Sequence, residues 1–115
     1  MKFMLLIYGD EKAWEAQDQA DRAAVLAEYG AFTRAIEAAG VMRGGDELHS
    51  TASATTVRVR EGRTLTTHGP FAETREQLGG FYVLECASLE DASRWAAQIP
   101  AARHGSVEVR PIVAF

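Results

Sequence analysis

The feature that most constrains the fold is the alternation of extended and helical patterns along the 115-residue chain. Lys2–Tyr8 is a mostly apolar run that ends at Gly9-Asp10, which is typical of a central strand covered on both faces. An alanine-rich, acidic segment follows and carries an apolar stripe with spacings of four, three, four and three. The stripe consists of Val25, Tyr29, Phe32, Ile36 and Ala39. This periodicity predicts an amphipathic helix.

Capping residues predict where the helices begin and end. Asp18 suits the start of the first long helix and Gly40 its end, with Trp14 on a short preliminary turn. Ser88 suits the start of a second helix, which Pro100 stops. Its apolar side consists of Leu89, Ala92, Trp95, Ala96 and Ile99.

The remaining segments predict strands and loops. Val41–Thr51 has no clear period and suits a loop with a short edge strand, whereas Gly80–Cys86 and Gly105–Val113 suit strands. Pro111 places the end of the last strand at a sheet edge or a bulge. The segment 69–79 is expected to be a loop, with one helical turn at Thr74–Gln77.

A hairpin with a two-residue turn is predicted where Glu61-Gly62 separates Thr55–Arg60 from Arg63–His68. Because opposed residues share a face, the register predicts the composition of both faces. One face consists of Val57, Val59, Thr64, Thr66 and His68. The other consists of Arg58, Arg60, Arg63, Leu65 and Thr67. His68 is therefore expected on the valine-bearing face.

Two helices among strands predict one α+β domain over residues 1–115 with a ferredoxin-like split β-α-β arrangement and an antiparallel sheet. Two helices cover only one face of such a sheet. Tyr82, Leu84 and Cys86 alternate with Phe81 and Val83, so both faces of this strand are apolar. We therefore expect a homodimer in which sheet faces sheet.

Composition narrows the choice of partners. The net charge of −4 and the pI of about 5.3 disfavour nucleic acid, and no segment has the ~20 apolar residues of a membrane span. Cys86 is the single cysteine, so no internal disulfide is expected and a cytoplasmic location follows by default. The histidines lack ligand spacing and the phosphate-binding glycine motifs are absent, so neither a metal nor a cofactor is expected.

One segment resembles the signature of the YCII-related family in its DGPF branch. It reads Thr66-Thr67-His68-Gly69-Pro70-Phe71-Ala72-Glu73-Thr74-Arg75-Glu76-Gln77-Leu78-Gly79-Gly80-Phe81-Tyr82. Further similar segments are Met4–Tyr8, Glu28–Phe32, Thr55–Arg60, Trp95–Ala102 and Gly105–Pro111. The resemblance covers nearly the whole chain and implies a dimeric ferredoxin-like α/β barrel. Some members lie beside or are fused to sigma factors, which implies a regulatory setting.

The chain departs from the family pattern at two places. His68 stands where the DGPF motif begins with Asp, and no histidine occurs between Met1 and Leu48. Better-studied relatives have a candidate His–Asp pair whose histidine lies on the first helix, about where this chain has Tyr29. Any chemistry is therefore expected from His68 and its loop.

The candidate site residues each allow a functional and a structural interpretation. His68 could act as a general base or a ligand group, or be a polar strand end, and Glu73 could be its partner carboxylate or a solvated loop acid. Phe71 could line a pocket or anchor its loop in the core. Tyr29 suits a cavity mouth or the core, and Arg75 and Tyr82 complete the predicted binding set.

Two functions follow from these residues. The first is a small-molecule-binding or regulatory homodimer with a cleft at the His68–Gly80 loop. The alternative is an enzyme that uses His68 and Glu73 for general acid–base chemistry on a small metabolite.

Overall fold

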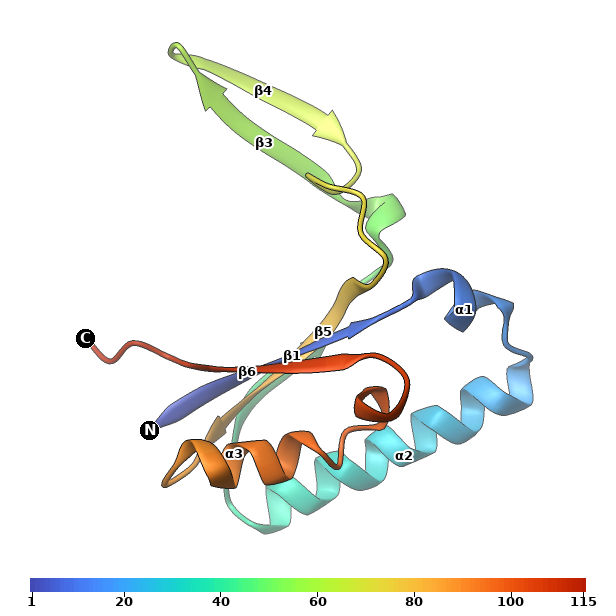
Figure 1. The fold of residues 1–115 in the computed structure, drawn as a ribbon, viewed down its shortest axis with the longest axis vertical. Coiled ribbons are helices and arrows are strands. Elements are labelled where there is room, and N and C mark those ends of the chain that lie inside the picture. The colour runs from blue at the N-terminus through green and yellow to red at the C-terminus, as the bar shows by residue number, and fades with distance from the viewer.

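The computed structural model describes residues 1–115 and contains six strands, three α-helices and two 3₁₀ turns (Figure 1). In chain order these are β1 (Lys2–Gly9), α1 (Glu11–Ala16), α2 (Gln19–Ala38), β2 (Met42–Glu47), η1 (Thr51–Ser53), β3 (Thr55–Arg60), β4 (Arg63–His68), β5 (Gln77–Glu85), α3 (Leu89–Ala96), η2 (Pro100–Arg103) and β6 (Ser106–Pro111).

The main sheet has four strands in the order β2-β5-β1-β6, and each neighbouring pair is antiparallel. This order confirms the predicted ferredoxin-like arrangement. The edge strand β2 occupies the segment for which a short edge strand was predicted. The other edge strand, β6, ends at Pro111, as expected for a residue without an N–H donor.

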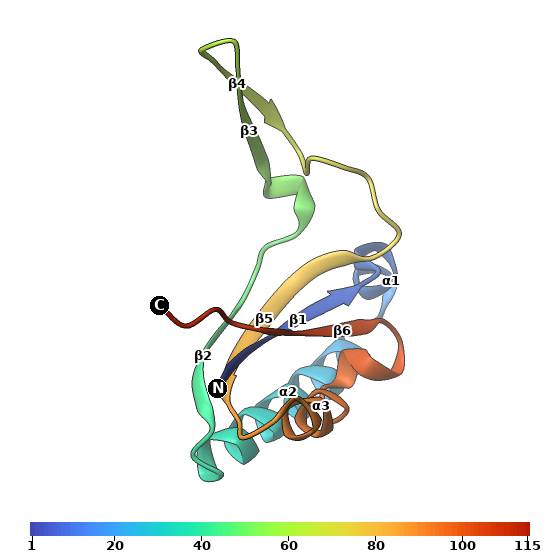
Figure 2. The ribbon, with the colours of Figure 1, turned by 60° about the vertical axis from the view of Figure 1, so that its left-hand side comes forward.

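Helices α2 and α3 lie on one face of the main sheet, where the core forms (Figure 2). Phe3, Leu5 and Leu84 point from the sheet toward Phe32 and Ile36 of α2, and all five side chains are buried. Ala92, Ala96 and Ile99 complete the apolar layer from the α3 side. The predicted helix stripe is thus the surface that packs on the sheet.

Both predicted helix starts are confirmed by the capping hydrogen bonds. Asp18 accepts the backbone N–H of Asp21 at 2.8 Å, and Ser88 accepts that of Asp91 at 3.2 Å. These side chains satisfy donors that have no partner within the helix. Trp14 lies on α1, the expected short turn before the long helix.

The opposite face of the main sheet has no helix over it and is called here the open face. By strand alternation its central strands carry Met4, Leu6, Phe81 and Val83, which are partly exposed, and its edge strands carry the charged residues Asp46, Glu108 and Arg110. Four partly exposed apolar side chains without a covering layer form the kind of surface that proteins use for association.

Strands β3 and β4 form a separate two-stranded sheet, which we call the arm (residues 55–68). The predicted register is confirmed, with Val57 opposite Thr66 and Arg60 opposite Arg63. Glu61 and Gly62 have φ values of 51° and 74°, as a two-residue hairpin turn requires. The arm projects from the main sheet on the side away from the helices, and both views show this (Figures 1 and 2).

The arm gives the single chain an unusually large surface for its mass. The radius of gyration is 16.1 Å, whereas a globular chain of this length has about 13 Å. The accessible surface is 8083 Å², compared with about 6,200 Å² for a typical folded monomer of 12.5 kDa. The surplus is about 1,900 Å².

Two local predictions are wrong. Thr74–Gln77 forms no helical turn, because the hydrogen-bonded ladder with β1 already begins at Gln77. Gly79 is the extra residue of a bulge there, since Ile7 pairs with Gly80 and Tyr8 pairs with Leu78. The last strand also ends at Pro111 rather than Val113.

Candidate functional site

The loop 69–76 connects the arm to β5, and polar contacts hold its second half. The Thr74 hydroxyl donates to the backbone oxygen of Glu76 at 2.5 Å, and the Gln77 amide donates to the backbone oxygen of Thr74 at 2.6 Å. Ser106 at the start of β6 donates its hydroxyl to the Glu76 carboxylate at 2.8 Å. The loop is therefore tied to the end of the main sheet.

A second connection joins the loop end and the arm base to α1. The Glu11 carboxylate accepts the backbone N–H and the hydroxyl of Thr51, both at 2.7 Å. The Glu11 backbone N–H donates to the Gln77 side-chain oxygen at 3.0 Å. One acidic residue thus links helix α1, turn η1 and strand β5.

These anchoring residues were missed by sequence reasoning. Glu11 and Thr51 are 40 residues apart, and Glu76 and Ser106 are 30 residues apart. Each resembles an ordinary solvated side chain in its own segment. Only the closing of the sheet brings the partners together.

The predicted pair His68 and Glu73 is not assembled within one chain. His68 ends β4 on the valine-bearing face, opposite Thr55, and is exposed. Glu73 is exposed in the loop, and no hydrogen bond or ion pair joins the two side chains; the ion pairs of the chain involve other residues. Acid–base chemistry by this pair would therefore need a movement of the loop or a second copy.

Phe71 and Arg75 are both exposed in the same loop. Phe71 is 77% exposed, so the interpretation that it anchors the loop in the core is wrong. The physical reason is that the loop runs from the base of the arm to β5, away from the helix-covered face where the core forms (Figure 1). An exposed phenylalanine and an exposed arginine in one loop can contact a ligand or another chain.

Tyr29 and Tyr82 lie on the helix-covered side of the main sheet, apart from this loop. Thr33 donates its hydroxyl to the backbone oxygen of Tyr29 at 2.9 Å, so the Tyr82 hydroxyl, 2.9 Å from Thr33, is the donor in that pair. The Tyr82 ring meets Phe32 edge-on with 5.0 Å between centroids. The interpretation of Tyr29 as a core residue is supported, and Tyr82 shares its layer.

The environment of Tyr29 favours the neutral phenol. Burial raises the pKa of Tyr29, and Tyr82 and Glu47 act in the same direction. A hydrogen bond with the backbone of Ala101 opposes this rise, as does the charge of Arg103. Tyr29 is thus a hydrogen-bonding group at neutral pH rather than a base.

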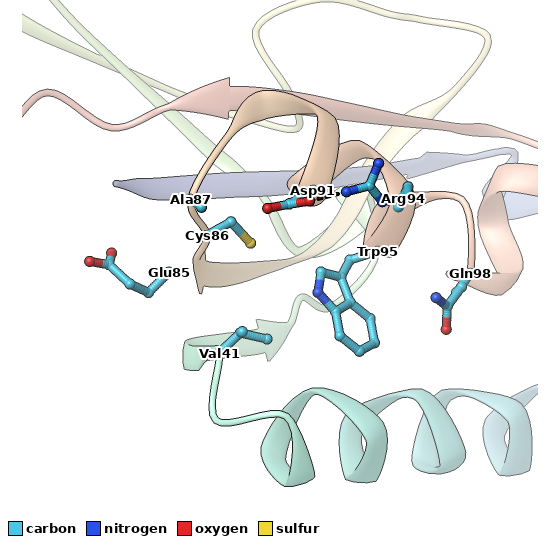
Figure 3. Close-up of a pocket in the computed structure, with 8 residues that line it drawn as sticks. All are labelled: Val41, Glu85, Cys86, Ala87, Asp91, Arg94, Trp95 and Gln98. Carbon is cyan, nitrogen blue, oxygen red and sulfur yellow. Dashed lines mark hydrogen bonds and ion pairs between the residues drawn. The ribbon is translucent and has the colours of Figure 1, made fainter.

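The surface has nine hollows, and neither of the two described here is lined by a predicted site residue. One of about 350 Å³ lies between α3 and the end of β5, where Trp95 points toward α2 and Arg94 pairs with Asp91 (Figure 3). Cys86 lines it, and burial followed by the charge of Asp91 raises the pKa of this thiol. The second, of about 260 Å³, lies over Phe32.

Metal binding and membrane crossing each have recognisable structural requirements. No group of three or more His, Cys, Asp or Glu side chains is arranged to hold a metal ion. No helix combines the length and the apolar composition that crossing a membrane requires.

Comparison with known proteins supplies the family. The model of the YCII-related domain matches residues 1–115. The chain is also similar to an uncharacterized protein of Rhizobium meliloti (strain 1021), with 37% identity over 117 residues that cover 100% of this chain and 94% of the relative. The match extends over the sheet, the helices, the arm and the loop alike, and the chain therefore belongs to the YCII-related family.

Proposed function

We propose that the chain works as a homodimeric small-molecule-binding module whose ligand site lies at the His68–Gly80 loop. The observation that best supports this proposal is the open face. Its residues Met4, Leu6, Phe81 and Val83 are apolar, and no other part of the chain covers them. A second copy covers this face by placing its own open face against it. The loop stands at the end of the same sheet.

The surplus of surface supports a partner of this size. A standard interface removes roughly 800 Å² from each partner, which is less than the surplus of about 1,900 Å² in the single chain. Burial of the open face in a dimer would therefore remove part of this surplus. It would also add a second apolar layer to a chain with few fully buried residues.

The loop residues suggest the kind of ligand. Arg75 and His68 can donate hydrogen bonds and are exposed without an acidic partner in the chain, and Phe71 offers an apolar ring. Arginine recognises carboxylates and phosphates through two parallel donors. We therefore favour a small anionic metabolite with an apolar or planar part.

Light scattering tests the dimer. Leu6→Asp places a charge on the open face and should yield a monomer at 50 µM, whereas the wild type should have twice the chain mass. Leu26→Asp is the matched control, because Leu26 is an exposed leucine on α2. A monomeric wild type, or a Leu6→Asp variant that stays dimeric, would contradict the proposal.

A thermal-shift series tests the ligand site. Small carboxylates and phosphate esters are added at 10 mM to the wild type and to the Arg75→Ala variant. A compound with a Kd of 100 µM stabilises by about 2.7 kcal/mol, which is a clear shift in melting temperature for a domain of this size. Shifts that are absent throughout the series, or equal in both proteins, count against this site.

An enzyme that uses His68 and Glu73 is the second candidate. The observation in its favour is that both side chains are exposed and unengaged, so they are free to approach a substrate. Once a ligand is found, its conversion can be followed by mass spectrometry with the wild type and with His68→Ala. Catalysis requires turnover by the wild type and at least a hundredfold loss in the variant.

A further inference from the structure

The arm is a structural element without support from its own chain. Val57 and Val59 are 59% and 60% exposed, and Leu65 on the other face is 48% exposed. Strands β3 and β4 pair only with each other, and no other element packs extensively on them. An isolated two-stranded hairpin is marginally stable in water at best, so a surface that covers one of its faces would stabilise it.

The position of the arm indicates which surface this is. Along the long axis of the molecule the arm, the main sheet and the helices follow one another, so the arm rises on the side of the open face (Figures 1 and 2). A second copy that sits on the open face therefore lies beside the arm. The arm of each copy can then extend along the flank of the other.

The two faces of the arm differ in the desolvation free energy that their burial would cost. One face carries Val57 and Val59 with threonines and His68, and the other carries Arg58, Arg60 and Arg63. Arg60 and Arg63 are directly opposite each other, so a partner that covered them would desolvate two like charges. The valine-bearing face is therefore the one suited to contact, and the arginines remain in solvent.

Charge favours another copy of this chain as the occupant. The arm contains three arginines and one glutamate, so its net charge is +2, which leaves −6 for the rest of a chain whose total is −4. A basic arm beside an acidic body is attracted to it, and charges at the rim of an interface speed association.

The size of the open face also favours a contribution from the arm. Four strands with the usual spacing and about six residues of rise give a face of roughly 19 Å by 20 Å, or roughly 400 Å² in projection. This is about half of the 800 Å² that each partner contributes to a standard interface. A second contact surface is needed to approach that value.

We propose that the arm clasps the second copy of the chain through its valine-bearing face. The inference rests on the proposed homodimer and adds its second contact surface. It also has a consequence for the ligand site: His68 belongs to the clasping face at the base of the arm, so its site lies between two copies and is completed by the partner.

Paired variants on the two faces of the arm test this proposal. Val57→Asp with Val59→Asp charges the valine-bearing face, and Leu65→Asp is the control on the other face of the same hairpin. Sedimentation equilibrium measures the dimer Kd of each protein, and circular dichroism checks the fold, which should persist because none of these side chains lies in the core. We expect the double variant to raise the Kd at least about tenfold and the control to change it less than about threefold.

Hydrogen exchange gives a second readout in the unmodified protein. Amides of residues 55–68 should exchange more slowly as protein concentration rises through the dimer Kd, because the clasped arm opens less often. A dimer whose valine-face variant keeps the wild-type Kd, or in which both faces respond equally, overturns the clasp and leaves the sheet-to-sheet dimer intact. A monomeric wild type overturns both proposals.

Discussion

The Glu11 carboxylate can be tested as the connector between α1 and the base of the arm. It accepts two hydrogen bonds from Thr51, both at 2.7 Å and both partly buried. Replacement by alanine leaves the Thr51 N–H and hydroxyl without their acceptor. Glu15 on the same helix makes no side-chain hydrogen bond or ion pair, so Glu15→Ala is the matched control.

The magnitude follows from the number and exposure of these hydrogen bonds. A hydrogen bond to a charged group contributes roughly 1.5–3 kcal/mol, but water can replace the lost acceptor at a half-exposed site. We therefore expect a loss of about 1–2 kcal/mol for the pair. Unfolding entropy for this length is about 0.24 kcal/mol/K, so the melting temperature should fall by about 4–8 °C.

Calorimetry at one fixed protein concentration measures this fall, because the melting temperature of the proposed dimer would depend on concentration. Thr51→Val and the Glu11→Ala, Thr51→Val double variant complete a cycle that isolates the hydroxyl contact. Hydrogen exchange should also accelerate at residues 50–54 in Glu11→Ala. The reasoning is refuted if Glu11→Ala melts within 1 °C of Glu15→Ala.

Three further predictions concern the main sheet and its helix-covered side. Gly105→Ala should cost at least about 2 kcal/mol in urea denaturation, because the added Cβ would lie 2.2 Å from the Tyr8 oxygen, whereas Gly9→Ala meets nothing within 4 Å and should be mild. Tyr82→Phe removes the hydroxyl that donates to a threonine of α2 and should cost about 1 kcal/mol by the same assay. Burial raises the pKa of Tyr29 in the folded state, so its contribution to stability is complete below the unfolded value near 10 and declines as pH rises through the folded pKa. Tyr29→Phe should therefore flatten the alkaline loss of stability, and a pH profile that is unchanged would contradict this.

Local patterns predicted the elements whose residues act on their near neighbours. The helix starts at Asp18 and Ser88 depend on bonds that span three residues, so they follow from the sequence. The hairpin register follows from a two-residue turn at Glu61-Gly62, and with it the position of His68 on the valine-bearing face. The prediction of a helical turn at Thr74–Gln77 was wrong, because pairing with the distant strand β1 outweighs local helix propensity.

The sequence by itself determined the family, the α+β class, the order of the elements and the apolar character of both faces of the strand at Gly80–Cys86. These properties depend on periodicity and on a family resemblance that extends over nearly the whole chain. Only the tertiary structure decided that the arm stands free of its own chain, that Phe71 is exposed, and that His68 and Glu73 do not meet within one copy. It also decided that Glu11 joins Thr51 across 40 residues. The physical reason is that these contacts depend on the angle at which the hairpin leaves the sheet and on which distant segments the closed sheet brings side by side. No short-range pattern encodes either of these.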